Sequence, residues 1–361
     1  HFRMKSGGRL LAPYPSIAKS RVDQLFLAYT GYSLNPNAAP QYQFWEPHEL
    51  IPLLAHMDRS TGRFDGQMWT DFLFLALGIL DERGDGKYLT RSETAPATRA
   101  DWERYTAELF ACNRNLDALY QAVAAVPYPH ANVWIALPYP NPSVFPDDAL
   151  RLDAVLDWLQ SFLATWRETP YERRLSLQGF YWLQESIYYQ GPEYDDRLLI
   201  RSVNQAIHRL NFRGKKYRTL WIPYQLANAR EEWEQLGFDL ALLQPNYYFN
   251  PERKLETAAA EAYANGQGFE MELDLAVTYD EAKRARFIEY MNLGATGGYD
   301  AAGNYFGPYM LESPLGWYTG GWYLGKNGRK QSIVSLYQNN DPLYDQIYSF
   351  LNGTYPKSVT P

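Results

Sequence analysis

Short apolar runs alternate with longer stretches of helical periodicity along the chain. The runs have the length and composition of buried strands, and they are bounded by turn residues. Alternating strands and helices are typical of βα units and a parallel sheet. The pattern predicts eight strands, at residues 24–30, 71–77, 132–137, 177–183, 218–223, 240–244, 268–273 and 294–298.

Helical patterns occupy the intervals between these runs. The interval 147–167 begins with Asp147 and Asp148, and acidic residues are favoured at a helix N-terminus by the helix dipole. We also expect one long helix over 100–125 and helices that begin near Tyr194, Ala229, Glu252 and Asp280. A last helix is expected from near Ser332 to before Gly353.

Eight strands with intervening helices are the number needed for a (β/α)8 barrel. A doubly wound sheet would need a glycine-rich phosphate turn after the first strand, and residues 29–33 do not form one. No linker or charge block divides the chain, so residues 1–361 are predicted to form a single barrel domain. The longest connections follow strands 1 and 2, roughly 40 residues or more each, and we expect them to wall the catalytic face of the barrel.

The seventh predicted strand, 268–273, carries an unusual set of side chains. Alternation along a strand puts Phe269 and Met271 on one face and Glu270 and Glu272 on the other. Buried carboxyl groups are costly unless they are paired or hydrogen-bonded, so acids inside a barrel strand favour a functional explanation. An edge strand with a solvated polar face is the alternative.

The fourth predicted strand, 177–183, is followed by Glu185. Barrel enzymes place their catalytic groups at the C-terminal ends of strands, although an acid in this position can also be a cap or loop residue. Carboxyl groups on strands 4 and 7 can face each other across the barrel mouth. Cleavage of a glycosidic bond needs such a pair, because one acid protonates the leaving oxygen while the other attacks or activates water.

This layout resembles the large clan of retaining glycosidases with an acid/base on strand 4 and a nucleophile on strand 7. The resemblance implies that Glu185 is the acid/base, with a raised pKa, and that Glu272 is a nucleophile kept ionised by hydrogen bonds. Glu272 is preferred to Glu270 because it lies nearer the C-terminal end of the strand, while the deeper Glu270 could orient or tune its neighbour. In that clan an Asn commonly precedes the acid/base, whereas here Gln184 stands in its place.

The chain also resembles a bacterial family named domain of unknown function 4855. The resemblance rests on the segments Gly179-Phe180-Tyr181-Trp182, Trp221-Ile222-Pro223-Tyr224 and Gln244-Pro245-Asn246-Tyr247-Tyr248-Phe249, which lie in the central part of the chain. The family name conveys no activity.

Aromatic residues make up 16% of the chain, with 11 Trp, 30 Tyr and 17 Phe. A surplus of Tyr and Trp fits a wet cleft in which sugar rings stack, because both have an apolar ring and a polar group. An aromatic-rich core is the alternative explanation. Several polar and aromatic residues lie at or after strand ends, and we expect them to bind substrate: Tyr29, Trp182, Gln184, Trp221, Tyr224, Gln244, Asn246, Tyr247 and Trp317. We predict that at least two of Trp182, Trp221, Tyr247 and Trp317 line the cleft.

Other classes of function are disfavoured. The formal net charge is -7, with no basic stripe for nucleic acid, and no apolar run reaches the ~18 residues of a membrane helix. The five histidines form no close pair, so we expect no metal and no other cofactor. Cys112, the single cysteine, is expected to be buried inside a helix.

The sequence therefore predicts a glycoside hydrolase that cleaves a poly- or oligosaccharide, with retention of configuration or, as a variant, with inversion. A non-catalytic carbohydrate-binding protein on the same barrel is the alternative. The chain starts at His1 rather than Met, and we expect a monomer that is secreted or held at the bacterial cell surface.

Overall fold

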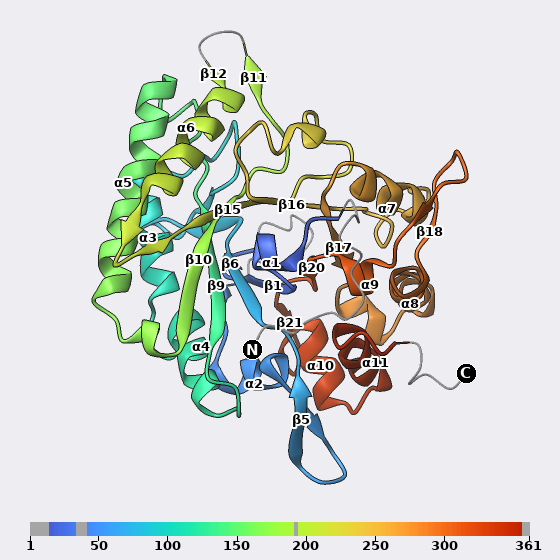
Figure 1. The fold of residues 1–361 in the computed structure, drawn as a ribbon. Coiled ribbons are helices and arrows are strands. Elements are labelled where there is room, and N and C mark those ends of the chain that lie inside the picture. The colour runs from blue at the N-terminus through green and yellow to red at the C-terminus, as the bar shows by residue number, and fades with distance from the viewer. Residues whose placement is uncertain (1–13, 34–41, 191–193, 356–361) are drawn as a thin grey trace.

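Eight parallel strands close into a barrel, in chain order, in the computed structural model, which describes residues 14–33, 42–190 and 194–355. The first strand closes the ring by pairing with the last, Gln24 opposite Leu315. The predicted (β/α)8 barrel is confirmed (Figure 1). Its strands are β1 (Gln24–Tyr29), β6 (Asp71–Leu75), β9 (Ala131–Leu137), β10 (Leu175–Trp182), β15 (Arg218–Trp221), β16 (Leu240–Leu243), β17 (Gly268–Glu272) and β20 (Leu315–Tyr318).

The predicted position of the eighth strand is wrong. The predicted 294–298 falls on the end of helix α8 (Glu281–Thr296), and the barrel closes with β20 instead. This strand is short and contains Gly316, so it lacks a continuous apolar run. A Cβ at this position would lie 2.8 Å from the end of the Leu242 side chain, which would have to shift to make room for it.

Helices α5 (Asp148–Arg167), α6 (Asp196–Arg209) and α7 (Leu255–Ala264) form close to their predicted positions. The long helix predicted over 100–125 is wrong, because it is split into α3 (Arg99–Leu109) and α4 (Asn115–Ala124). Asn113 and Asn115 take the left-handed backbone conformation at the break. Cys112 lies in this connection and is exposed, so its predicted burial in a helix is also wrong.

Two further helix predictions need correction. Near Ala229 the chain makes only the short 3-10 turn η2 (Arg230–Glu232). The last helix is divided into α10 (Ser332–Gln338) and α11 (Pro342–Leu351), since Pro342 cannot continue a helix and instead starts one, with Asp341 as its N-cap.

Further short helices and strands lie outside the eight barrel strands. Residues 34–41, in the connection after β1, lie outside the described residues, and the rest of this connection contains β2 (Gly31–Tyr32), β3 (Tyr42–Gln43), α2 (Pro47–Leu54), β4 (Ala55–Asp58) and β5 (Arg63–Gln67). The other short elements are α1 (Ile17–Ser20), β7 (Gly78–Leu80), β8 (Gly86–Tyr88), η1 (Tyr171–Arg173), β11 (Tyr189–Gln190), β12 (Tyr194–Asp195), β13 (Asn211–Phe212), β14 (Lys215–Lys216), η3 (Leu275–Thr278), β18 (Gly298–Tyr299), β19 (Tyr305–Phe306), α9 (Tyr309–Glu312), β21 (Tyr323–Gly325) and β22 (Gly328–Lys330). Helices α3, α5 and α6 cover one side of the barrel, and α10 and α11 lie away from them (Figure 1).

The core takes up much of the aromatic surplus. Trp69 packs between Phe26 and Trp317, with ring centroids 5.1 and 5.4 Å away. Trp45, Trp134 and several other large rings are also fully buried. The aromatic-rich core that the composition left open is therefore present. No helix among the described residues is long and apolar enough to cross a membrane.

Candidate functional site

A pocket of about 140 Å³ opens at the C-terminal ends of the barrel strands. It brings together carboxyl groups from two strand ends, with amide and aromatic groups around them. Its lining residues are Leu27, Tyr29, Tyr181, Glu185, Ile222, Gln244, Asn246, Phe249, Glu270, Glu272 and Tyr318. All three predicted acids, together with Tyr29, Gln244 and Asn246, therefore meet in one place.

Side chains alternate between the two faces of β17, and this alternation directs Glu270 and Glu272 into the pocket. Phe269 points outward and packs against Tyr309, with ring centroids 4.5 Å apart. The glutamates point inward, where only 2% of Glu270 and 3% of Glu272 remain exposed. The inward orientation of both acids, expected from the sequence, is what the structure shows, and the edge-strand alternative is excluded because β17 pairs on both sides.

Glu272 is held by two hydrogen-bond donors. The hydroxyl of Tyr290, on α8, donates to Oε1 of Glu272 at 2.6 Å. The backbone N–H of Asn246 provides the second hydrogen bond, from a residue with a left-handed φ of 59°. Asn is one of the residues that tolerates this conformation. Both donors favour the charged form of the carboxyl group.

The three carboxyl groups nevertheless resist ionisation. Burial, and then the neighbouring charges of Glu272 and Glu185, raise the pKa of Glu270 well above its ordinary value. Burial raises the pKa of Glu272 to about 8, with its two hydrogen bonds opposing the rise. The expectation that Glu272 stays ionised stays a prediction. Closely packed buried carboxyl groups cannot all carry charge, and the two hydrogen bonds favour Glu272 as the one that does.

Glu185 lies three residues beyond the end of β10. The residue is exposed to solvent, and it also lines the pocket. Partial removal of its carboxyl group from water raises its pKa, and a hydrogen bond with the Gln244 side chain opposes the rise. A raised pKa is what we expect of an acid/base, and contact with water gives this group a route for proton exchange.

Gln184 holds the Glu185 loop rather than lining the pocket. Its side-chain oxygen accepts a hydrogen bond from the backbone N–H of Arg91 at 3.0 Å, and its backbone carbonyl accepts one from Trp221 Nε1 at 2.9 Å. Arg91 belongs to the long connection after β6, and its guanidinium lies over the ring of Tyr188. This connection therefore acts on the site by fixing the loop that carries Glu185.

The four predicted stacking residues do not line the pocket. Trp182, Trp221 and Trp317 are buried, and Tyr247 donates its hydroxyl hydrogen bond to Glu289 on the outer surface. Tyr224 is also outside the lining, and its hydroxyl accepts from Asn246 Nδ2 at 3.5 Å. The prediction that at least two of the four line the cleft is wrong.

Strand alternation explains these misplacements. Tyr181, Ile222 and Tyr318 point into the pocket. The adjacent residues Trp182, Trp221 and Trp317 therefore point to the opposite face of their strands. Applying the alternation used for β17 to β10 would have identified Tyr181. Tyr318 lies on β20, so its inward direction follows from alternation once β20 is recognised as the eighth strand. Tyr290 and Phe249 carry no signal in the sequence, because a helix and a loop bring them to the site.

A possible group of metal ligands lies elsewhere, where Glu46, His48 and Glu49 come together at the start of α2. Arg329 forms ion pairs with both glutamates. The guanidinium therefore already supplies the positive charge at this position.

Comparison with known proteins gives a family match and a distant structural likeness. A family model described as "Domain of unknown function (DUF4855)" matches residues 24–149 and 144–312, which include Glu185, Glu270 and Glu272. The crystal structure of xylanase B from Clostridium stercorarium F9 is similar over 84% of this chain and 88% of that chain, with 11% identity and a TM-score of 0.35. A likeness at this level supports no argument about activity. No curated protein sequence matches the chain.

Proposed function

We propose that this chain, which belongs to the DUF4855 family, is a glycoside hydrolase that cleaves a poly- or oligosaccharide with retention of configuration. The observation that carries the proposal is the meeting of Glu185, after β10, and Glu272, on β17, in one pocket at the C-terminal end of the barrel. Two carboxyl groups facing one bond are the minimum machinery for this reaction.

Glu185 is assigned as the acid/base. Its raised pKa keeps a proton available, which it gives to the glycosidic oxygen as the leaving group departs. The Glu185 carboxylate then takes a proton from the water that hydrolyses the glycosyl–enzyme intermediate. Its solvent-exposed surface suits this second step, because water must reach the carboxylate.

Glu272 is assigned as the nucleophile, attacking the anomeric carbon as a carboxylate and leaving again when water attacks. The hydrogen bonds from Tyr290 and from the Asn246 backbone stabilise its charge. Burial and the neighbouring charges of Glu272 and Glu185 raise the pKa of the deeper Glu270 well above its ordinary value, so we assign Glu270 as the group that keeps its proton. When Glu270 is neutral, the negative charge stays on Glu272. We therefore assign Glu270 as a positioning residue.

The lining also bears on the kind of sugar. No Lys, Arg or His is found among the residues that line the pocket in the described part of the chain. A carboxylate or sulfate on the reacting sugar would meet three acids and no cation, which is unfavourable. A neutral sugar at the cleavage point is the substrate class proposed.

The deciding experiment begins with a screen of neutral polysaccharides and aryl glycosides for reducing-end release, followed by NMR of the first-formed anomer. A retaining enzyme first releases a product with the same anomeric configuration as the substrate. Its two catalytic carboxyl groups should lie roughly 5–5.5 Å apart, against about 6.5–9.5 Å in an inverting enzyme. Trapping with a 2-deoxy-2-fluoro glycoside should label Glu272. Labelling of Glu185 instead would reverse the two roles, while glycan binding without release by any substrate would favour the carbohydrate-binding alternative.

A further inference from the structure

A second and larger pocket, of about 670 Å³, lies at the opposite end of the barrel. Its position follows from the chain, because Arg218 is the first residue of β15, Asp239 directly precedes β16, and Lys19 and Arg21 precede β1. This volume is within the range of small-molecule sites. The pocket is lined by Lys19, Arg21, His208, Lys216, Tyr217, Arg218, Trp233, Glu234, Gly237, Phe238 and Asp239.

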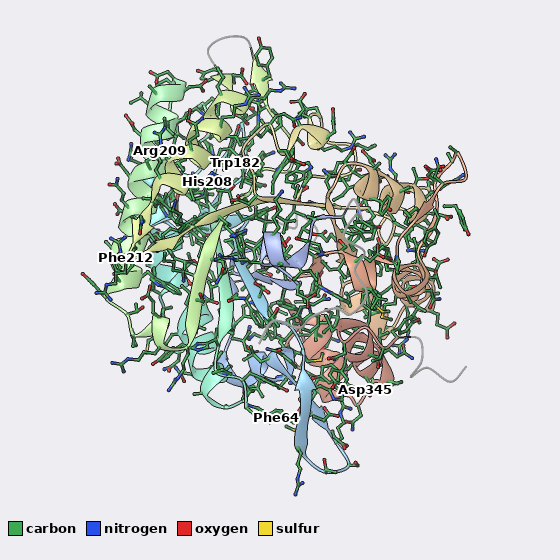
Figure 2. The ribbon with its side chains drawn as sticks, in the orientation of Figure 1. Phe64, Trp182, His208, Arg209, Phe212 and Asp345 are labelled. Atoms are coloured by element: carbon green, nitrogen blue, oxygen red, sulfur yellow. The ribbon has the colours of Figure 1, made fainter. Side chains whose placement is uncertain are left out.

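The lining carries an excess of positive charge. Lys19, Arg21, Lys216 and Arg218 contribute cationic groups, and no carboxylate lies within 4.0 Å of their nitrogen atoms in the ranges that the structure describes. Asp239 is already engaged, because one of its oxygens is 2.7 Å from His208 Nε2 and accepts from Thr219 N–H at 2.8 Å. His208 is near the C-terminal end of α6 (Figure 2).

Two of the cationic groups, Arg21 and Arg218, are held close enough for one to affect the other. The guanidinium of Arg218 donates a hydrogen bond to the backbone carbonyl of Lys19, which ties the strand end to α1. Burial, and then the charge of Arg21, lower the pKa of Arg218. Arg21 itself caps α1 in a left-handed conformation, with φ at 58°. The fold thus holds Arg21 and Arg218 close together at this pocket, and a bound anion would relieve their repulsion.

Aromatic side chains form the apolar part of the same pocket. Tyr217, Trp233 and Phe238 line the pocket and are almost fully buried. Trp233 is fixed by a 3.0 Å hydrogen bond from Nε1 to the backbone carbonyl of Asn265. Cations around an apolar floor suit a ligand with an anionic group on an organic body.

We propose that this pocket binds an organic phosphate or sulfate, with Lys19, Arg21, Lys216 and Arg218 contacting its oxyanion. The ligand would bind at the end of the barrel opposite the three glutamates. The site is therefore separate from the proposed hydrolase centre and does not depend on that assignment.

Isothermal titration calorimetry of the whole chain tests the proposal with glucose 6-phosphate, glucose 6-sulfate, inorganic phosphate, inorganic sulfate and glucose. We expect saturable binding of at least one sugar ester, weaker binding of the matching inorganic ion and no binding of glucose. The preferred ester identifies the anion. Absence of saturable binding of both esters up to about 10 mM would overturn the proposal.

Substitutions of the cationic residues test whether the ester binds in this pocket. The double variant Arg21→Asn, Lys216→Gln removes two of the cations, and Asn tolerates the left-handed backbone at position 21. We expect it to lose about tenfold or more in affinity for the ester. The matched control Lys326→Gln, Lys330→Gln removes two charges from exposed positions on the β21–β22 hairpin and should bind like the unaltered protein. Equal affinity of the first variant and the control would overturn the assignment of this pocket.

Discussion

The hydroxyl of Tyr290 donates a 2.6 Å hydrogen bond to Glu272 and accepts one from the backbone N–H of Tyr248 at 2.8 Å. A hydroxyl that receives a hydrogen bond is a better donor to the next group. Residues from α8, from the loop after β16 and from β17 are thus joined in one chain of hydrogen bonds. This chain ends on the carboxyl group that we assign as the nucleophile.

Replacing Tyr290 by Phe should therefore impair catalysis through Glu272. Loss of the donor raises the pKa of Glu272 further. Because kcat/KM increases with pH as the nucleophile ionises, this part of the pH profile should move to higher pH. We expect kcat to fall by about 10- to 100-fold. Tyr105→Phe is the control, since its buried hydroxyl donates only to the Ala136 carbonyl. An unshifted pH profile in Tyr290→Phe would contradict the assigned role of the hydrogen bond.

Glu270→Gln should change the dependence of stability on pH. The pKa of Glu270 is raised in the folded protein, so its contribution to stability is present below the unfolded pKa and is lost as pH rises through the folded value. Gln resembles the protonated form at every pH. The variant should match the unaltered protein near pH 5 and be more stable above pH 8, by on the order of 1 kcal/mol. Thermal unfolding at the two pH values measures this, and an equal difference at both would exclude a buried titrating group.

Strand positions could be predicted from the sequence because seven of the eight barrel strands are apolar runs between helices. The eighth was missed because Gly316 interrupts a short strand whose neighbours look like loop residues. The acids of β17 were found through alternation, which is a local property of the backbone. Tyr290 and Phe249 reach the pocket through tertiary packing, and no local pattern records that.

The aromatic residues that line the pocket give a prediction about oligosaccharide binding. Phe249 and Tyr318 pack edge to face, with centroids 5.6 Å apart, and both line the pocket. Phe249→Ala should weaken binding of an oligosaccharide by about 1 kcal/mol through lost apolar contact, measured as an increase in Kd with the inactive Glu272→Gln background. Tyr247→Phe, at a position outside the lining, is the control. If the control weakens binding as much as Phe249→Ala, the substrate lies outside this pocket.

A buried histidine gives the last prediction. His56 lies between two carboxylates, with Nδ1 2.6 Å from Asp65 and Nε2 2.6 Å from Asp345. The contact joins the β4–β5 hairpin to α11, and Figure 2 shows Asp345 beside the hairpin that carries Phe64. Tyr348 stacks on the imidazole at 4.0 Å between centroids.

Burial alone would lower the pKa of His56, but its hydrogen bonds to Asp345 and Asp65 outweigh burial and raise it. The physical reason is that a neutral imidazole has one N–H and can donate to only one carboxylate, whereas the cation donates to both. Because the folded pKa is the higher one, the stabilisation is full below the unfolded pKa and is lost as pH rises through the folded value. His56→Gln should therefore reduce the free energy of unfolding by about 1 kcal/mol at pH 6 and by less at pH 9. Urea unfolding at both pH values measures this, with the exposed His130→Gln as control. An equal loss at both pH values would show that the histidine contributes packing and not charge.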